Sequence, residues 1–341
     1  WVVDYAGNGD YTFIHEAIEA ASNGDEIRVQ PGTYFGGDAD NDGQQDDVVF
    51  NLMGRSIRIY SSAGPEYTFI DGRVDNIPMA RGIRCSSGET ENTIIEGFTI
   101  QNCTAQGQND WNGEGGGLIC IGSNPTIRNC KFISNYADHG AAIYFKRNNN
   151  TTGIFEIDTC QLIANTGGDG SIKTRDGSVN IHDCYFYNNN MAGKGGGAYL
   201  QSEASLINCL FVSNTAPEGG GVYIFGGIGA NVEYCTFEMN IASRFDDAGG
   251  GGGIKVNGGE INVSNCNFIS NTAFKGGGVS LVEQVTQGHS TFGDIQNCSF
   301  EENEATWEGG AIYQKASSFS VSGTAFLNNS SESAGGAIAN V

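Results

Sequence analysis

The residues best spaced to bind a metal ion lie in an acidic run near the N-terminus, from residue 38 to residue 47. Carboxylates stand at positions 1, 3, 5 and 9 of this run, with glycine at position 6, which is the spacing of the first part of a calcium loop. Val49 stands at position 12, where such a loop usually has a bidentate Glu. The run predicts a structural calcium ion (Ca2+), and the alternative is a solvated acidic insertion. The expected ligands are Asp38, Asp40, Asp42, Gln44 and Asp46.

Catalytic chemistry has weaker support in the sequence. A β-elimination on an acidic polysaccharide needs a base near a cation that neutralises the substrate carboxylate. The one cluster of this kind comprises Asp169, Lys173, Arg175 and Asp176, with His182 on the following strand. Hydrolysis would need carboxylates roughly 5–9.5 Å apart. Neither arrangement can be distinguished from scattered surface charge, so the sequence favours a protein that is not an enzyme.

Charge and hydropathy exclude several classes of partner. The chain has 341 residues, with 17 Lys and Arg against 39 Asp and Glu, giving a net charge of −22. Nucleic acids and anionic membranes are therefore poor partners. No apolar run approaches the roughly 18 residues of a transmembrane segment. The chain begins at Trp1, which indicates a processed or partial chain, and its acidic, Asn- and Gly-rich composition suits a secreted or cell-surface protein.

The elements that must position these residues are set by a repeat. The phrase Cys-x-Phe-x-x-Asn and its close variants recur about every 28 residues, which is typical of a solenoid. A branched apolar residue stands three positions before each cysteine. Because side chains alternate along a strand, a corner must separate that residue from the cysteine. The seven cysteines of this row are Cys130, Cys160, Cys184, Cys209, Cys235, Cys266 and Cys298, and Thr324 takes the eighth place.

Glycine runs form a second recurring phrase, about ten residues after the cysteine position, and each run opens another strand. The copies begin at Gly115, Gly140, Gly195, Gly219, Gly251, Gly276, Gly309 and Gly335. Each repeat is thus three short strands without a helical period. Such a unit buries its apolar face only when every strand pairs in parallel with the same strand of the next coil. The sequence therefore predicts an all-β fold, a parallel β-helix forming a single domain over residues 1–341.

This domain has four predicted parts. Residues 1–35 form an N-terminal cap, a short helix around Ile14 and Ile18, and the first strand, and residues 36–49 form the acidic insertion. Residues 50–96 form degenerate coils, and residues 97–341 form the regular coils. The last coil has no cap, which predicts either further chain or stacking onto a second subunit, as in a head-to-tail filament.

The cysteine row predicts buried free thiols that act as small hydrophobic residues. A disulfide between adjacent coils is compatible with the strand spacing, and Cys85, Cys103 and Cys120, which lie off the row, are the better candidates for one. The asparagines five positions after each cysteine are expected to stack at a second corner and to hydrogen-bond from coil to coil.

Two further rows are predicted to lie on the surface. Acidic residues precede the glycine runs, as at Asp169, Glu218 and Glu308, and they either bind cations or keep the protein soluble. Beside them an outward row on the third strand carries aromatic residues that could contact a glycan. Its tyrosines are Tyr144, Tyr199, Tyr223 and Tyr313. The alternative is that tyrosine stands there for its strand propensity alone.

Three resemblances accompany these patterns. The helix, strand and Pro31-Gly-Thr-Tyr34 segment resembles the start of right-handed, pectate-lyase-like β-helices. The Phe-x-x-Asn and Gly-Gly-Ala-Ile tetrapeptides of residues 97–341 resemble polymorphic outer-membrane protein repeats. The acidic run is similar to the short Asp-rich calcium loops of extracellular repeat proteins. The repeat family implies secreted or surface-displayed, adhesin-like proteins rather than enzymes.

The resulting prediction is a secreted or cell-surface β-helix that acts as a structural or adhesin-type module, with calcium stabilising its N-terminal part. An extracellular glycan or a surface receptor is the expected partner, together with self-association through the last coil. The alternative is a polysaccharide lyase or glycoside hydrolase on the same fold.

Overall fold

The computed structural model describes residues 1–36, 47–74, 77–78, 80–105, 113–148, 152–226, 229–246, 249–283, 290–315 and 318–341. The chain divides into two compact units, each of which is a stack of parallel coils. Unit 1 comprises Trp1–Thr166 and Arg175–Ser178, and unit 2 comprises Gly167–Thr174 and Val179–Val341. The predicted all-β parallel β-helix with a short N-terminal helix is confirmed.

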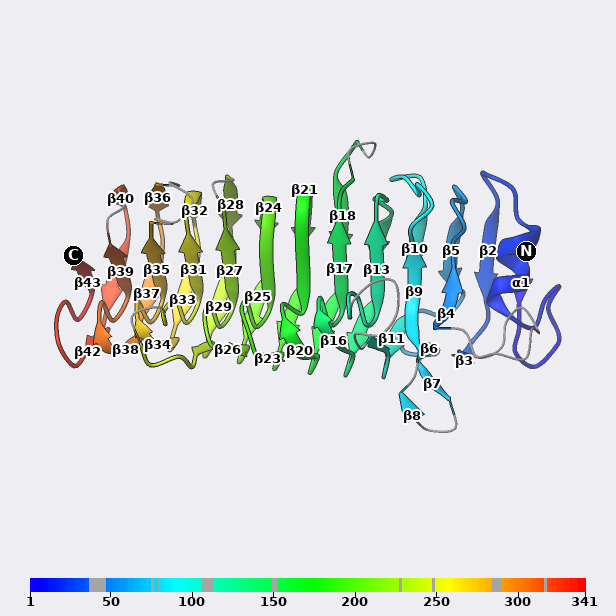
Figure 1. Ribbon diagram of the computed structural model, residues 1–341, viewed down its shortest axis with the longest axis horizontal. Coiled ribbons are helices and arrows are strands. Elements are labelled where there is room, and N and C mark those ends of the chain that lie inside the picture. The colour runs from blue at the N-terminus through cyan, green and yellow to red at the C-terminus, as the bar shows by residue number, and fades with distance from the viewer. Residues whose placement is uncertain are drawn as a thin grey trace. The chain divides into compact units, whose positions relative to one another are not determined.

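Helix α1 (Ile14–Ala20) packs against β1 (Val2–Val3), β2 (Glu26–Val29) and β4 (Val48–Asn51). It buries Ile14, Ala17 and Ile18, the face predicted from their spacing. The backbone N–H of Phe13 donates to the Glu16 side chain at its start, and Figure 1 shows it beside β2. With seven residues it is too short to cross a membrane, and the described residues include no helix with the length and hydropathy of a membrane span.

Each coil of unit 1 has a first strand, a second strand that carries the Phe position, a short bridge strand in the later coils, and a third strand after the glycine run. The first strands stand side by side in Figure 1 and pair in parallel. They are β2, β5 (Arg58–Ser61), β10 (Ile94–Glu96), β14 (Thr126–Arg128) and β18 (Phe155–Asp158). The second strands are β3 (Gly32–Phe35), β6 (Thr68–Asp71), β11 (Thr99–Gln101), β15 (Lys131–Ile133) and β19 (Gln161–Ile163).

The bridge strands of unit 1 are β12 (Thr104–Ala105) and β16 (Tyr136–His139). Its third strands are β4, β9 (Arg81–Cys85), β13 (Leu118–Ile121) and β17 (Ile143–Lys146). The bridge strand was not predicted, because its two to five residues are too few to show the alternation of apolar and polar residues that marks a strand. A small antiparallel pair, β7 (Arg73–Val74) with β8 (Ile77–Pro78), projects from the coils.

Unit 2 repeats this plan. In β21 (Ile172–His182) and β24 (Ala198–Ile207) the third strand runs on into the next first strand. Further first strands are β28 (Ala230–Glu233), β32 (Gly259–Ser264), β36 (Thr291–Gln296) and β40 (Ser318–Ser322). The second strands are β22 (Tyr185–Tyr187), β25 (Leu210–Val212), β29 (Thr236–Glu238), β33 (Asn267–Ile269), β37 (Ser299–Glu301) and β41 (Ala325–Leu327).

The bridge strands of unit 2 are β23 (Asn190–Met191), β26 (Thr215–Ala216), β30 (Ile241–Ala242), β34 (Thr272–Lys275), β38 (Glu304–Glu308) and β42 (Ser330–Ser331), and β20 (Thr166–Asp169) begins at the unit boundary. The remaining third strands are β27 (Val222–Phe225), β31 (Ile254–Asn257), β35 (Val279–Val282), β39 (Ile312–Lys315) and β43 (Ile338–Asn340).

Two corners frame the second strand in each regular coil, and both are made by residues in the left-handed region. The first corner is the residue before the cysteine, such as Tyr234 at φ +55°, and it is the corner that the sequence requires. The second is the residue before the asparagine, such as Met239 at φ +53°. This backbone conformation is costly for non-glycine residues, so neighbouring contacts must hold it.

The predicted asparagine ladder is one of those contacts. The Asn240 side chain donates to Asn271 Oδ1 at 2.9 Å and to the Phe211 carbonyl at 2.9 Å. Its own Oδ1 accepts the backbone N–H and the Nδ2 of Asn214, both at 3.0 Å. The same bonds link Asn135 with Asn165 in unit 1. A corner in one coil is thus stabilised by the amide of the next.

All ten cysteines are buried free thiols. Cys235 Sγ accepts the backbone N–H of Cys209 at 3.4 Å and donates to the Leu206 carbonyl at 3.5 Å. The three cysteines off the row have their own places in unit 1. Cys85 and Cys120 are in register on β9 and β13, and Cys103 fills the asparagine position, where its N–H donates to Asn135.

Candidate functional site

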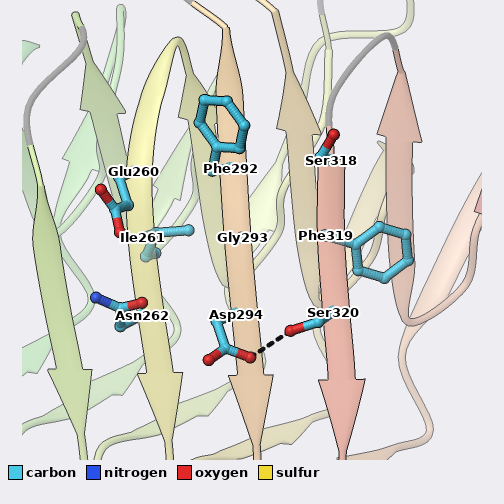
Figure 2. Close-up of a pocket in the computed structure, with 9 residues that line it drawn as sticks. All are labelled: Glu260, Ile261, Asn262, Phe292, Gly293, Asp294, Ser318, Phe319 and Ser320. Atoms are coloured by element: carbon cyan, nitrogen blue, oxygen red, sulfur yellow. Dashed lines mark hydrogen bonds between the residues drawn. The ribbon is translucent and has the colours of Figure 1, made fainter.

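A hollow in unit 2 opens on the outer face of β32, β36 and β40, and Figure 2 shows the nine residues that line it. Alternation along the three strands decides which side chains reach it. One inward row crosses them in register, formed by Ile261, Gly293 and Phe319. The outward positions on either side of this row carry Glu260 and Asn262, Phe292 and Asp294, and Ser318 and Ser320.

Gly293 lies at the centre of the hollow and leaves room there, because it has no side chain. A Cβ at this position would lie 2.7 Å from Cδ1 of Leu281, the end of a side chain that packs behind it. The hollow measures about 320 Å³, the lower end of the size range of small-molecule sites. Its most exposed large hydrophobic side chain is Phe292, 54% exposed on the middle strand.

The polar groups of the hollow are held in place. Asp294 Oδ1 accepts a hydrogen bond from Ser320 Oγ at 2.5 Å, drawn in Figure 2. Asp294 Oδ2 accepts one from Gln296 at 2.6 Å, and the Asn262 amide donates to Asn231 at 3.1 Å. The nine lining residues include two carboxylates and no Lys, Arg or His. The arrangement therefore offers an aromatic face, hydrogen-bonding groups and negative charge.

The tyrosines predicted to form an outward glycan-binding row are buried, which corrects that prediction. Tyr144, Tyr199, Tyr223 and Tyr313 are 1%, 6%, 0% and 2% exposed. The reason is the turn before each third strand, which folds back over the outer face of the strand. A Cβ on Gly219 would lie 2.9 Å from the Cβ of Tyr223. Burial raises the pKa of the Tyr144 and Tyr223 hydroxyls.

Lysine ammonium groups cover the tyrosine rings of unit 2. Lys173 Nζ lies 4.8 Å from the centroid of the Tyr199 ring, and Lys275 Nζ lies 5.1 Å from that of Tyr313. Cation–π attraction is strengthened in such desolvated surroundings. These rings serve the packing of the third strand, and they offer no exposed surface for a ligand.

The acidic row before the glycine runs is partly internal as well. Glu218 is 5% exposed, and its Oε2 accepts a hydrogen bond from Lys255 Nζ at 2.7 Å. Arg244 approaches the other oxygen of Glu218 at 3.2 Å. Burial lowers the pKa of Lys255, and the carboxylate of Glu218 opposes that effect. Glu218 therefore neutralises a buried lysine and is not a solvated surface acid.

In the cluster predicted for β-elimination, the lysine and the histidine each lie beside a carboxylate. Lys173, 7% exposed, pairs with Asp169 at 2.9 Å in unit 2. His182, also in unit 2, lies 3.4 Å from Asp183. In unit 1, Arg175 and Asp176 are exposed, and Asp176 has φ +57° in a turn. Lys173 is thus enclosed and already paired, which removes it from the groups that could meet a polysaccharide.

The predicted calcium ligands Asp38, Asp40, Asp42, Gln44 and Asp46 lie outside the described residues. Asp47, the last residue of the acidic run, is described. Its carboxylate pairs with Arg81 at 3.0 Å and with Arg84 at 2.6 Å. These ion pairs join Asp47, the residue before β4, to β9 of unit 1.

Sequence reasoning missed the hollow, although a signal for it exists. Ile295 is the inward residue three positions before Cys298, so alternation along the strand places Phe292 on the outer face. The sequence therefore places an aromatic side chain on the outer face of this strand, and this is the signal that was available. The sequence does not show that Glu260 and Ser318, which belong to other coils, lie beside Phe292.

Comparison with known proteins agrees with this architecture. A model of the right-handed β-helix region matches residues 46–237 and 116–292. A model of the Chlamydia polymorphic membrane protein repeat matches residues 297–315. Together the two models indicate a surface-exposed or secreted β-helix protein, as the resemblances implied.

One curated relative is the metabotropic glutamate receptor-like protein R of Dictyostelium discoideum, 30% identical over 155 residues. The match spans 44% of this chain and 9% of that protein. A solved structure, the mannuronan C-5 epimerase AlgE6 A-module of Azotobacter vinelandii, aligns with 96% of this chain and 93% of its own at 12% identity. Its TM-score of 0.27 carries no argument about function. The coils, their two corners and the matched residues together place this chain in the right-handed β-helix family.

Proposed function

We propose that this chain is a secreted or cell-surface module of the adhesin type that binds an extracellular glycan in the hollow of β32, β36 and β40. The observation that carries the proposal is the exposed ring of Phe292, bordered by Asp294, Ser318 and Ser320 on an open face. An aromatic face packs on the C–H side of a sugar ring, and fixed acceptors and hydroxyls orient its hydroxyl groups.

Binding without turnover is favoured because the predicted base is enclosed. Lys173 is held by Asp169 and Tyr199. The hollow presents Glu260 and Asp294, which repel the uronic acids on which a lyase acts.

The test is glycan binding by the whole chain, first on an array and then by calorimetry, with Phe292→Ala as the variant. Loss of an aromatic contact at the centre of a site is expected to weaken binding by about tenfold or more. Tyr187→Ala is the matched control, because Tyr187 is an exposed aromatic residue on a different sheet of the same unit. Equal affinities of Phe292→Ala and the parent protein, or no glycan bound at all, would contradict the proposal.

A glycoside hydrolase is the second candidate, and one observation favours it. Two carboxylates, Glu260 and Asp294, stand on adjacent strands at the same hollow, and glycoside hydrolysis commonly uses a carboxylate pair. Incubation with neutral glycans should then release new reducing ends. Glu260→Gln and Asp294→Asn should each abolish that release while the protein remains folded.

Calcium binding and end-to-end assembly stay proposals. The spacing of Asp38, Asp40 and Asp42 supports calcium. Assembly is supported by the apolar side chain of Leu327 on β41 in unit 2, which is 53% exposed. Sedimentation over a range of protein concentrations would reveal stacking, and a concentration-independent monomer would count against it.

A further inference from the structure

A second hollow adjoins the first in unit 2, and the two share residues. It measures about 310 Å³. Phe292 and Ser318 line both hollows, so the Phe292 side chain stands between them. The remaining residues of the second hollow are Ser290, Thr291, Gln314, Asn340 and Val341. A ligand longer than one ring can therefore occupy both sides of Phe292.

The two hollows differ in charge. The first contains the carboxylates of Glu260 and Asp294 with no basic side chain. The second is lined by hydroxyl, amide and apolar side chains and contains no charged one. Glu260 is exposed at the rim, and Asp294 is fixed by Ser320 and Gln296 with its carboxylate on the outer face. The first hollow thus offers a fixed negative charge beside an aromatic ring.

A cation suits this combination. Ammonium groups are attracted both to carboxylates and to aromatic faces. The net charge of −22 on the whole chain adds a long-range field that attracts cations and repels anions. A neutral sugar would leave Glu260 and Asp294 without a charge partner, and an acidic sugar would be repelled by both.

Resting on the glycan binding proposed above, we propose that the two hollows form one groove for an oligosaccharide of at least two residues that carries a free amino group. The amino sugar lies in the first hollow, where its ammonium group meets Glu260 and Asp294. A neutral sugar unit lies in the second hollow, where Asn340 and Ser290 offer hydrogen bonds. Phe292 packs between the two rings.

The experiment measures affinities of the whole chain by calorimetry for three probes: a glucosamine disaccharide, its fully N-acetylated counterpart and free glucosamine. The amino disaccharide should bind at least about tenfold more tightly than the acetylated one, as expected for one close charge pair. That preference should fall as salt is added. Free glucosamine should bind more weakly than the disaccharide because it fills one hollow.

Variants separate the two hollows. Asp294→Asn and Glu260→Gln should remove the preference for the free amine, so that the amino and the acetylated disaccharides bind each variant with similar affinity. Asn340→Ala should weaken binding of the disaccharide and should leave the affinity for free glucosamine unchanged. Glu301→Gln on β37 changes charge away from the groove and is the matched control. All of these side chains are at least partly exposed, and thermal melting verifies that each variant is folded.

The outcomes are distinguishable. Equal affinity for the amino and acetylated disaccharides, with Phe292→Ala still weakening both, overturns the amine preference and leaves glycan binding standing. Equal affinity for glucosamine and its disaccharide overturns the shared groove. If only other glycans bind, and Phe292→Ala weakens them, the amino-sugar assignment fails while the proposed function survives. If no glycan binds, both fail together.

Discussion

At the scale of single residues, the stability of the coils depends on side chains that satisfy the backbone at left-handed corners. Asn240 satisfies four polar groups at once, two as donor and two as acceptor. Cys235 does a similar task at the other corner through its sulfur. Thr324 shows that a hydroxyl can replace the thiol at this corner, because its Oγ1 accepts the backbone N–H of Cys298 at 3.3 Å.

Asn240→Ala should be strongly destabilising. It leaves the backbone N–H of Asn214 and the carbonyl of Phe211 without their side-chain partner inside the protein. Each buried group left unpaired costs about 1–3 kcal/mol, so a loss of about 3–5 kcal/mol is expected in urea unfolding. Asn231→Ala, at an exposed position on β28, is the control and should change stability by less than about 0.5 kcal/mol. Similar losses in the two variants would contradict the role of the ladder.

The buried thiols should make the protein lose stability in alkaline solution. The thiol of Cys235 and burial raise the pKa of Cys266 to about 12, from an ordinary value of 9.0. The folded state therefore keeps a proton that the unfolded chain loses above about pH 9, so stability is fully present below that pH. It should fall by about 1.4 kcal/mol per pH unit for each such thiol as the pH rises from about 9 to about 12.

The same direction holds for Cys209, Cys235 and Cys298, whose pKa values are raised by neighbouring thiols and by burial. Unfolding measured from neutral to alkaline pH tests this effect. Cys266→Ser removes one titrating group and keeps a hydrogen-bonding atom, so its pH slope should be shallower by one thiol. An identical slope in the parent protein and in this variant would show that the thiols are not responsible.

At the scale of elements, the third strand is buried on both faces because the glycine run lets its preceding turn fold back. The first glycine of the run has a positive φ in every copy, as at Gly251 with φ +68°. The second and third positions are less strict, since Ala141 and Ala142 occupy them in one copy and Ala311 takes the third in another. The same turn hides Tyr223 and brings Glu218 to Lys255.

Gly251→Ala should therefore cost more than Gly253→Ala. At Gly251 a Cβ would lie 2.2 Å from the Ile254 carbonyl oxygen, and the left-handed backbone adds roughly 1–2 kcal/mol for any L-residue. At Gly253 the Cβ would lie 2.7 Å from the Gly278 oxygen, a place that alanine fills in other coils. The difference in unfolding free energy should be at least about 1 kcal/mol. Equal costs would mean that crowding rather than backbone conformation selects the first glycine.

At the scale of the whole molecule, the acidic residues behind the net charge of −22 have several different roles. Some acids form ion pairs with cations of the chain, such as Asp47 with Arg81 and Arg84. Others give the first hollow its charge. The densest group is the acidic run, where a bound cation would relieve the repulsion among its carboxylates.

Removal of calcium should lower the melting temperature if the acidic run binds it. A ligand held at 100 times its dissociation constant stabilises the folded state by about 2.7 kcal/mol, so a drop of several degrees on adding a chelator is expected. The double variant Asp40→Asn and Asp42→Asn should melt at the lower temperature and should not respond to the chelator. An unchanged melting temperature of the parent protein on chelation would refute a structural calcium ion.

Much of the fold follows from local patterns in the chain. The period of the Cys, Phe and Asn positions requires stacked coils, and alternation requires a corner before each cysteine, found in residues such as Tyr234 and Asn265. The spacing of Ile14, Ala17 and Ile18 predicts α1. These features depend on neighbours in sequence or on the same position in the next repeat. They can therefore be predicted from the sequence alone.

The candidate site could not be predicted from the sequence in this way. Alternation states that Tyr223 faces away from the coil interior, but only the tertiary structure shows that its own turn covers it. In the same way, Glu260, Phe292 and Ser318 come from three coils, and their meeting depends on the register between strands. The sequence by itself determined the coil, its corners and its ladders, because a repeat constrains each residue against its own copies. The tertiary structure decided which outward faces remain open, because that depends on how turns and neighbouring coils pack over them.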